Sequence, residues 1–119
     1  MNVVVVGASD KPDRYSYKAV MLLKEKGHTV FPVHPRIKTI NGMEVFPSIQ
    51  NISAAIDTVS LYVAADISNV MVEDILNTKP KRIIFNPGAE NPSLFQKGND
   101  SGIKTLNACT LVLLNTGQF

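Results

Sequence analysis

The residues best suited to bind an anion lie in one short loop. An apolar run ends at Gly7, and the polar residues after it include two cations, Lys11 and Arg14. Glycine lets a backbone turn sharply near a ligand, and the N–H groups at the start of a helix favour negative charge. Ser9 and Ser16 add hydroxyl donors. We therefore predict a phosphate site here, the alternative being an ordinary solvated loop.

The loop lacks the glycine patterns of two common phosphate-binding motifs. Counted from Gly7, the dinucleotide fingerprint G-x-G-x-x-G requires glycine where the chain has Ser9 and Pro12. No G-K-[ST] sequence occurs, which excludes a P-loop. Charged side chains, more than glycines, would therefore hold a phosphate at this position.

A second group of polar residues follows the next predicted strand. His34, Pro35, Arg36 and Lys38 stand where NAD-binding folds usually carry an acid that binds the ribose hydroxyls. The missing acid favours a phosphorylated ribose, as in CoA or NADP, and Arg36 could pair with that phosphate in bidentate fashion. Simple exposure of Arg36 and Lys38 is the alternative. His34 is equally consistent with a ribose or base contact and with a hydrogen bond that stabilises a turn.

The other chemistry-bearing residues form no convincing catalytic or metal-binding pattern. Two histidines and one cysteine lack the spacing of a zinc site. Cys109 is interpreted as a buried structural thiol. Glu73 and Asp74 are expected on the solvated face of a helix. Binding without catalysis, with no catalytic residue and no metal, is therefore the expectation.

Composition and charge narrow the class of protein. The 119 residues, 45% hydrophobic with a net charge of +2, fit one globular domain. No apolar run is long enough to span a bilayer and no signal peptide is recognised, so a cytoplasmic location is expected by default. Residues 1–38 hold seven basic and three acidic residues, which indicates an anionic partner. The alternative for Lys18, Lys24 and Lys26 is a solvated helix face. Aromatic residues do not interleave with cations, so nucleic acid is not an expected partner.

Strands and helices are predicted to alternate along the chain. The strands are Asn2–Val6, His28–Val33, Thr58–Val63, Lys81–Phe85 and Ile103–Leu106, and the helices are Tyr15–Lys26, one capped by Asp66 and running to Thr78, and Ser93–Asn99. Smaller elements are an edge strand at Glu44–Phe46, a helical turn at Ser53–Ile56, and a segment at 111–114 that is helix or strand. This order predicts a single α/β domain over residues 1–119. Its fold would be Rossmann-like and doubly wound, with a mainly parallel five-stranded sheet and helices on both faces.

Several motifs carry a resemblance to a known family. Residues 5–17 read V-V-G-A-S-D-K-P-D-R-Y-S-Y and contain the pattern G-x-S-x-x-P-x-R-x-S-Y. Val30–Pro35 is similar to V-x-P-V-N-P, Phe46–Ile49 to Y-P-S-L, and Asn86–Ala89 to a glycine turn after the fourth strand. With these motifs the chain resembles the small stand-alone CoA-binding domain proteins, which are similar to the CoA-binding domain of the succinyl-CoA synthetase alpha subunit.

The resemblance implies binding of CoA or acyl-CoA in a cleft along the carboxyl ends of the strands. It places the phosphates at the first loop, the adenosine beside His34 and Pro35, and the rest of the ligand along two later loops. His34 stands where the family usually has Asn, and members often carry Arg or Pro at positions 64–66. The predicted site comprises Gly7, Ala8, Ser9, Lys11, Arg14, Tyr15, Ser16, His34, Pro35, Arg36, Val63, Ala64, Pro87 and Gly88.

Two other functions remain open at this point. One is an NADP-binding fragment of an oxidoreductase, which would share the basic segment after the second strand. The other is a CoA-responsive regulatory subunit, acting as a homo-oligomer or with a partner enzyme. The histidine-bearing domain through which synthetases transfer phosphate is not expected here, so ligase activity is not expected of this chain alone.

Overall fold

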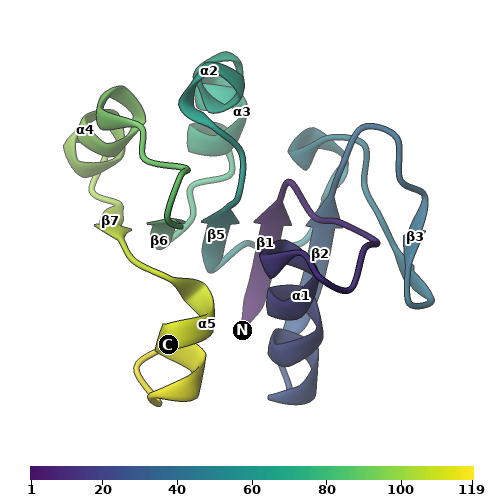
Figure 1. The fold of residues 1–119 in the computed structure, drawn as a ribbon. Coiled ribbons are helices and arrows are strands. Elements are labelled where there is room, and N and C mark those ends of the chain that lie inside the picture. The colour runs from purple at the N-terminus through teal and green to yellow at the C-terminus, as the bar shows by residue number, and fades with distance from the viewer.

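The computed structural model describes residues 1–119 and contains a five-stranded parallel sheet between two layers of helices (Figure 1). The sheet consists of β1 (Asn2–Val6), β2 (Thr29–Val33), β5 (Thr58–Leu61), β6 (Arg82–Phe85) and β7 (Lys104–Asn107). The helices are α1 (Tyr15–Glu25), α2 (Ala65–Ser68), α3 (Val72–Asn77), α4 (Pro92–Asp100) and α5 (Thr110–Asn115). The predicted α/β, Rossmann-like fold is confirmed.

Strand β1 lies inside the sheet and sets its topology. The strand order is β2-β1-β5-β6-β7, and β1 pairs in parallel with both β2 and β5. The chain therefore adds β2 on one side of β1 and then crosses over to add β5, β6 and β7 on the other side. Ligands of such sheets bind beyond the carboxyl ends of the strands at this reversal of order.

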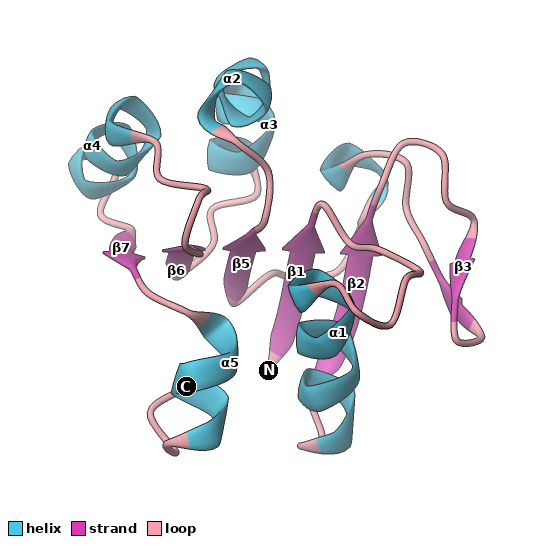
Figure 2. Ribbon diagram, in the orientation of Figure 1, coloured by secondary structure: helices cyan, strands magenta, loops and turns pink.

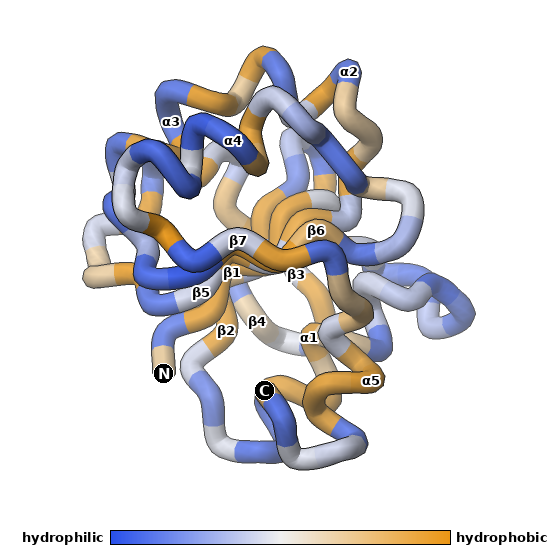
Figure 3. Tube along the Cα trace, turned by 90° about the vertical axis from the view of Figure 1, so that its left-hand side faces the viewer, coloured by the Kyte–Doolittle hydropathy of each residue, from blue (hydrophilic) through white to orange (hydrophobic).

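The valines of β1 explain why both faces of the sheet are covered. Val3, Val4 and Val5 are completely buried. Alternate side chains point to opposite faces, so Val4 packs with residues of α3 and α4, whereas Val5 packs with residues of α1 and α5. Figure 2 shows α1 and α5 on one side of the sheet and α2, α3 and α4 on the other. In Figure 3 the apolar strands lie between these layers.

The predicted long helix from Asp66 to Thr78 is wrong, because the structure breaks it in the middle. Helix α2 and helix α3 are separated by a 3-10 turn, η2 (Asn69–Met71), and the N-cap residue is Ala64. The break exposes Val70, at 81% of its surface, although a continuous helix would have buried it. The buried amide of Asn91 donates to Ser68 Oγ at 2.7 Å and to Asn69 Oδ1 at 2.9 Å, holding the break in place.

Smaller elements also differ from the prediction. The helical turn expected at Ser53–Ile56 lies earlier, as the 3-10 turn η1 (Ile49–Asn51), and the predicted edge strand becomes a hairpin of β3 (Thr39–Ile40) and β4 (Met43–Glu44). The ambiguous segment at 111–114 belongs to α5. Strand β5 ends at Leu61, although the Tyr62 N–H still donates to the Val6 carbonyl at 2.9 Å. No helix is long and apolar enough to cross a membrane.

Candidate functional site

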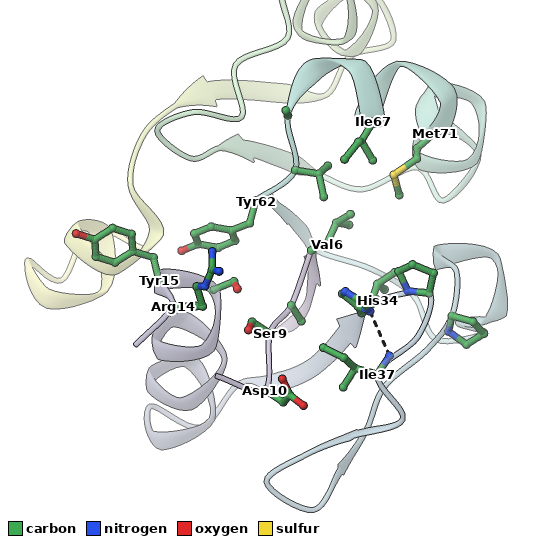
Figure 4. A pocket seen from close by; sticks show the side chains of 18 of the residues that line it. Val6, Ser9, Asp10, Arg14, Tyr15, His34, Ile37, Tyr62, Ile67 and Met71 are labelled. Atoms are coloured by element: carbon green, nitrogen blue, oxygen red, sulfur yellow. Dashed lines mark hydrogen bonds between the residues drawn. The ribbon is translucent and has the colours of Figure 1, made fainter. Parts of the chain in front are cut away.

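A cleft of about 870 Å³ lies at the carboxyl ends of β1, β2 and β5, at the reversal of strand order (Figure 4). Twelve of the predicted site residues line it, and Arg36 and Gly88 do not. The twelve are Gly7, Ala8, Ser9, Lys11, Arg14, Tyr15, Ser16, His34, Pro35, Val63, Ala64 and Pro87. The structure thus brings segments that are far apart in sequence into one surface.

Gly7 directly follows β1 and packs closely against Tyr62 and Val63, the residues after β5. Its φ angle is +84°, a region that favours glycine. A Cβ atom at this position would lie 2.8 Å from Val63 Cγ1 and 3.3 Å from the carbonyl carbon of Tyr62. The Gly7 N–H donates to the Val33 carbonyl at 3.0 Å, which ties the loop to β2. Glycine is therefore required here for both conformation and space.

The N-terminus of α1 opens on the cleft without a protein cap. The N-cap residue Arg14 makes no side-chain cap, and the first turn holds no acid. The first backbone hydrogen bond of the helix runs from the Lys18 N–H to the Arg14 carbonyl at 3.1 Å. The N–H groups of residues 15–17 are consequently free to bind an anion, which the helix dipole also favours.

Side chains of the β1–α1 loop add charge around that helix end. Lys11 and Arg14 are exposed, and they are the only lysine and arginine that line the cleft. Ser9 Oγ accepts a hydrogen bond from the Lys11 N–H at 3.1 Å, which shapes the loop. Asp10 also lines the cleft and was not among the predicted residues. The loop therefore presents two cations and one acid to the cleft, and its other acid, Asp13, does not line it.

His34 both lines the cleft and stabilises a turn. Its Nδ1 atom accepts hydrogen bonds from the N–H groups of Arg36 at 3.0 Å and Ile37 at 3.2 Å. An accepting Nδ1 carries no proton, so Nε2 holds the ring proton of the neutral side chain. The Oδ1 atom of Asn is the same number of bonds from Cα as Nδ1 of His. His34 can therefore stabilise this turn in the same way as the Asn that the family resemblance implies at this position.

Two predicted residues lie outside the cleft lining. Arg36 lies within the turn that His34 stabilises, and its side chain is exposed. Gly88 is also exposed, and its N–H donates to Glu90 Oε1 at 2.9 Å. Arg36 lies between two residues that line the cleft, Pro35 and Ile37, whereas Gly88 directly follows one, Pro87.

Sequence reasoning missed one wall of the cleft. Its apolar part includes Val6, Ile37, Pro47, Ile67 and Met71, and its polar part includes Ser48 and Asp74. In a continuous helix from Asp66 to Thr78, Ile67 and Met71 would face the core and Asp74 would be solvated. Pro47 and Ser48 belong to the quoted Y-P-S-L-like motif, which was the one available signal for this wall.

A buried polar network supports the sheet next to the cleft. The Asn86 amide donates to Ser60 Oγ at 2.9 Å and to the Leu61 carbonyl at 2.8 Å, while its oxygen accepts from the Thr110 N–H at 2.8 Å. Because Asn86 directly precedes Pro87, the network fixes where the β6–α4 loop meets the cleft. Burial raises the pKa of nearby Tyr62 well above its usual value, so its hydroxyl stays protonated.

Cys109 does not take part in the cleft. The residue is half-buried rather than fully buried, and it does not line the cleft. Partial exposure results from its position at the N-cap of α5, between the end of β7 and the helix. No group of three or more His, Cys, Asp or Glu side chains is arranged to hold a metal ion.

Comparisons with known proteins identify the family and the fold. A family model described as "CoA binding domain" matches residues 1–115. The chain is 27% identical to the uncharacterized protein YneT of Bacillus subtilis (strain 168) over 100 residues, covering 84% of this chain and 74% of that protein. The crystal structure of an uncharacterized protein superimposes with a TM-score of 0.89 at 36% identity, covering 99% of this chain and 97% of that one.

A larger enzyme shares the fold over part of its length. The acetyl-coenzyme A synthetase 1 of Ca. Korarchaeum cryptofilum, a dinucleotide-forming enzyme solved with phosphate and ADP, matches with a TM-score of 0.75 at 20% identity. The match covers 90% of this chain and 25% of that one, and it shows likeness of fold alone. The family match over almost the whole sequence is the decisive finding, and the chain belongs to the CoA binding domain family.

Proposed function

We propose that this protein binds CoA or acyl-CoA in the cleft between β1, β2 and β5 and does so without catalysing a reaction. The observation that carries the proposal is the uncapped N-terminus of α1, flanked by Lys11 and Arg14 at the reversal of strand order. A diphosphate is the part of CoA that matches free backbone donors with two neighbouring cations. Membership of the CoA binding domain family supports the same ligand.

The lining of the cleft supports one orientation of the ligand. With the diphosphate at α1, the adenosine would lie between His34 and Pro35 on one side and the wall of Ile67 and Met71 on the other. The pantetheine arm would leave past Ala64 and Pro87, toward β6. The volume of about 870 Å³ falls within the usual range for small-molecule sites.

Titration calorimetry with CoA, acetyl-CoA and dephospho-CoA at near-physiological salt tests this proposal. CoA and acetyl-CoA should bind, because the groups that hold the diphosphate do not contact the acyl end. Dephospho-CoA should bind more weakly if the exposed Arg36 and Lys38 reach the 3′-phosphate from the rim. Absence of binding heat and of a thermal shift with CoA would refute the proposed function, and equal affinity for dephospho-CoA would refute the role of Arg36 and Lys38.

A second candidate, NADP binding by an oxidoreductase fragment, is favoured by one observation. The segment after β2 contains Arg36 and Lys38 and no acid, which suits the 2′-phosphate of NADP as well as the 3′-phosphate of CoA. The same calorimetry with NADP and NAD separates the two functions. Tighter binding of NADP than of CoA would favour the oxidoreductase fragment.

A further inference from the structure

The end of the cleft opposite the cations carries one carboxylate and one hydroxyl joined through a single residue. Gln50 donates from its side-chain amide, Nε2, to Asp74 Oδ1 at 2.5 Å and from its backbone N–H to Ser48 Oγ at 3.2 Å. Both Asp74 and Ser48 line the cleft, whereas Gln50 does not. Gln50 therefore links the two side chains from outside the cleft lining.

These contacts leave a defined pair of hydrogen-bonding groups free. Asp74 Oδ1 is occupied, so Oδ2 remains as an acceptor. Ser48 Oγ already accepts a hydrogen bond, so its O–H remains as a donor. The cleft thus presents one acceptor beside one donor at this end.

The surroundings of the pair suit a flat aromatic ring and disfavour a phosphate. Pro47, Ile67 and Met71 line the same end, and a methionine sulfur packs well against aromatic rings. Figure 4 shows Met71 and Arg14 at opposite sides of the cleft. No lysine or arginine lines the cleft near Asp74, and the carboxylate would repel a phosphate there.

We propose that Asp74 and Ser48 select adenine as the base of the bound nucleotide. Asp74 Oδ2 accepts from the exocyclic amino group of adenine, and the Ser48 hydroxyl donates to a ring nitrogen next to it. Guanine carries a carbonyl oxygen in place of that amino group, and this oxygen would face the Asp74 carboxylate. Gln50 already donates to Oδ1, which disfavours a geometry in which the carboxylate binds guanine through both oxygens. The inference rests on the proposed binding of CoA.

Adenosine 3′,5′-bisphosphate and guanosine 3′,5′-bisphosphate isolate the base from the rest of CoA. In calorimetry with the full chain, we expect the adenosine compound to bind at least about tenfold more tightly, since one matched hydrogen bond to a charged group is worth at least that ratio. Equal affinity for the two compounds would overturn the inference even without any variant.

The variant Asp74→Asn changes the chemistry while keeping the shape. Gln50 can still donate to the side-chain oxygen of Asn, which leaves an NH₂ donor where Oδ2 was an acceptor. We expect the affinity for adenosine 3′,5′-bisphosphate to fall about tenfold and the preference over the guanosine compound to disappear or reverse. Glu73→Gln is the matched control, because Glu73 is exposed on the same helix and does not line the cleft.

The outcomes separate this inference from the proposed function. If CoA binds but both variants keep the same base preference, the selection by Asp74 is wrong and CoA binding stands. If both variants change the affinity equally, the effect does not depend on the place of Asp74 in the cleft, and the selection is again wrong. If CoA does not bind to the unaltered protein, both the function and the inference fall.

Discussion

At the scale of single residues, a side chain at Gly7 should destabilise the protein. Gly7→Ala forces a side chain into a φ of +84° and places Cβ 2.8 Å from Val63 Cγ1. Backbone strain alone costs about 1–3 kcal/mol, and the close contact adds to it. Gly27→Ala is the control, since Gly27 has a φ of +89° with no atom within 4 Å of a Cβ. Urea unfolding should show a greater loss for Gly7→Ala than for Gly27→Ala, and equal losses would mean that Val63 gives way freely.

The turn after β2 depends on one acceptor atom, Nδ1 of His34. His34→Asn keeps an acceptor at the same reach, so it should preserve the free energy of unfolding and the affinity for CoA. His34→Leu leaves the N–H groups of Arg36 and Ile37 without this partner and should cost about 0.5–1.5 kcal/mol. Denaturant unfolding of both variants checks this. A stable His34→Leu variant together with a destabilised His34→Asn variant would contradict the assigned role.

At the scale of elements, the start of α1 has no side-chain cap, and in the proposed function its free N–H groups bind a phosphate. Asn is a good N-cap residue, so Arg14→Asn should stabilise the protein by about 0.5–2 kcal/mol. The same change should weaken CoA binding, because it removes a cation and lets a side chain occupy the free N–H groups. The expected result is thus a higher melting temperature with a lower affinity.

Lys18→Gln is the matched control for this prediction. Lys18 is exposed on the same helix, and it does not line the cleft. Its loss should leave the affinity for CoA nearly unchanged apart from a small effect of net charge, which salt screens. If Lys18→Gln and Arg14→Asn weaken binding to the same degree, the α1 N-terminus is not the phosphate site.

The local sequence pattern was sufficient to predict the strands. It was not sufficient to predict the side of the cleft that is formed by α2 and α3. The valines of β1 and the alternation of strands and helices indicate a buried parallel sheet, and the position of its cleft follows from topology. The helix break depends on Asn91, which lies 22 residues from Asn69 in sequence and contacts it only in the folded chain. No periodicity within residues 65–77 contains that information. Because of this error, the prediction placed Ile67 and Asp74 outside the cleft. In the structure both residues line it.

At the scale of the whole molecule, the end of the sheet opposite the cleft gathers groups from distant parts of the chain. His28 Nδ1 lies 3.3 Å from the N-terminal amino group, and its ring packs edge-on against the ring of Phe119. The guanidinium of Arg82 also lies over the Phe119 ring, with its carbon 4.3 Å from the ring centre. Protonation of His28 would therefore add a positive charge beside two others.

This cluster predicts how stability depends on pH. The pKa of His28 lies below 6.5, mainly because the ring is partly buried and then because the N-terminal amino group and Arg82 repel its positive form. Asp57 has the opposite, smaller effect. Between the folded pKa and 6.5 the unfolded chain holds a proton that the folded chain does not, so stability falls as the pH drops through this window. Below the folded pKa the contribution of His28 becomes constant. His28→Gln should remove this part of the pH dependence, which urea unfolding of both proteins from pH 8 to pH 5 would measure. Parallel curves for the two proteins would show that His28 titrates alike in the folded and unfolded chains, and that the amino group and Arg82 do not act on it.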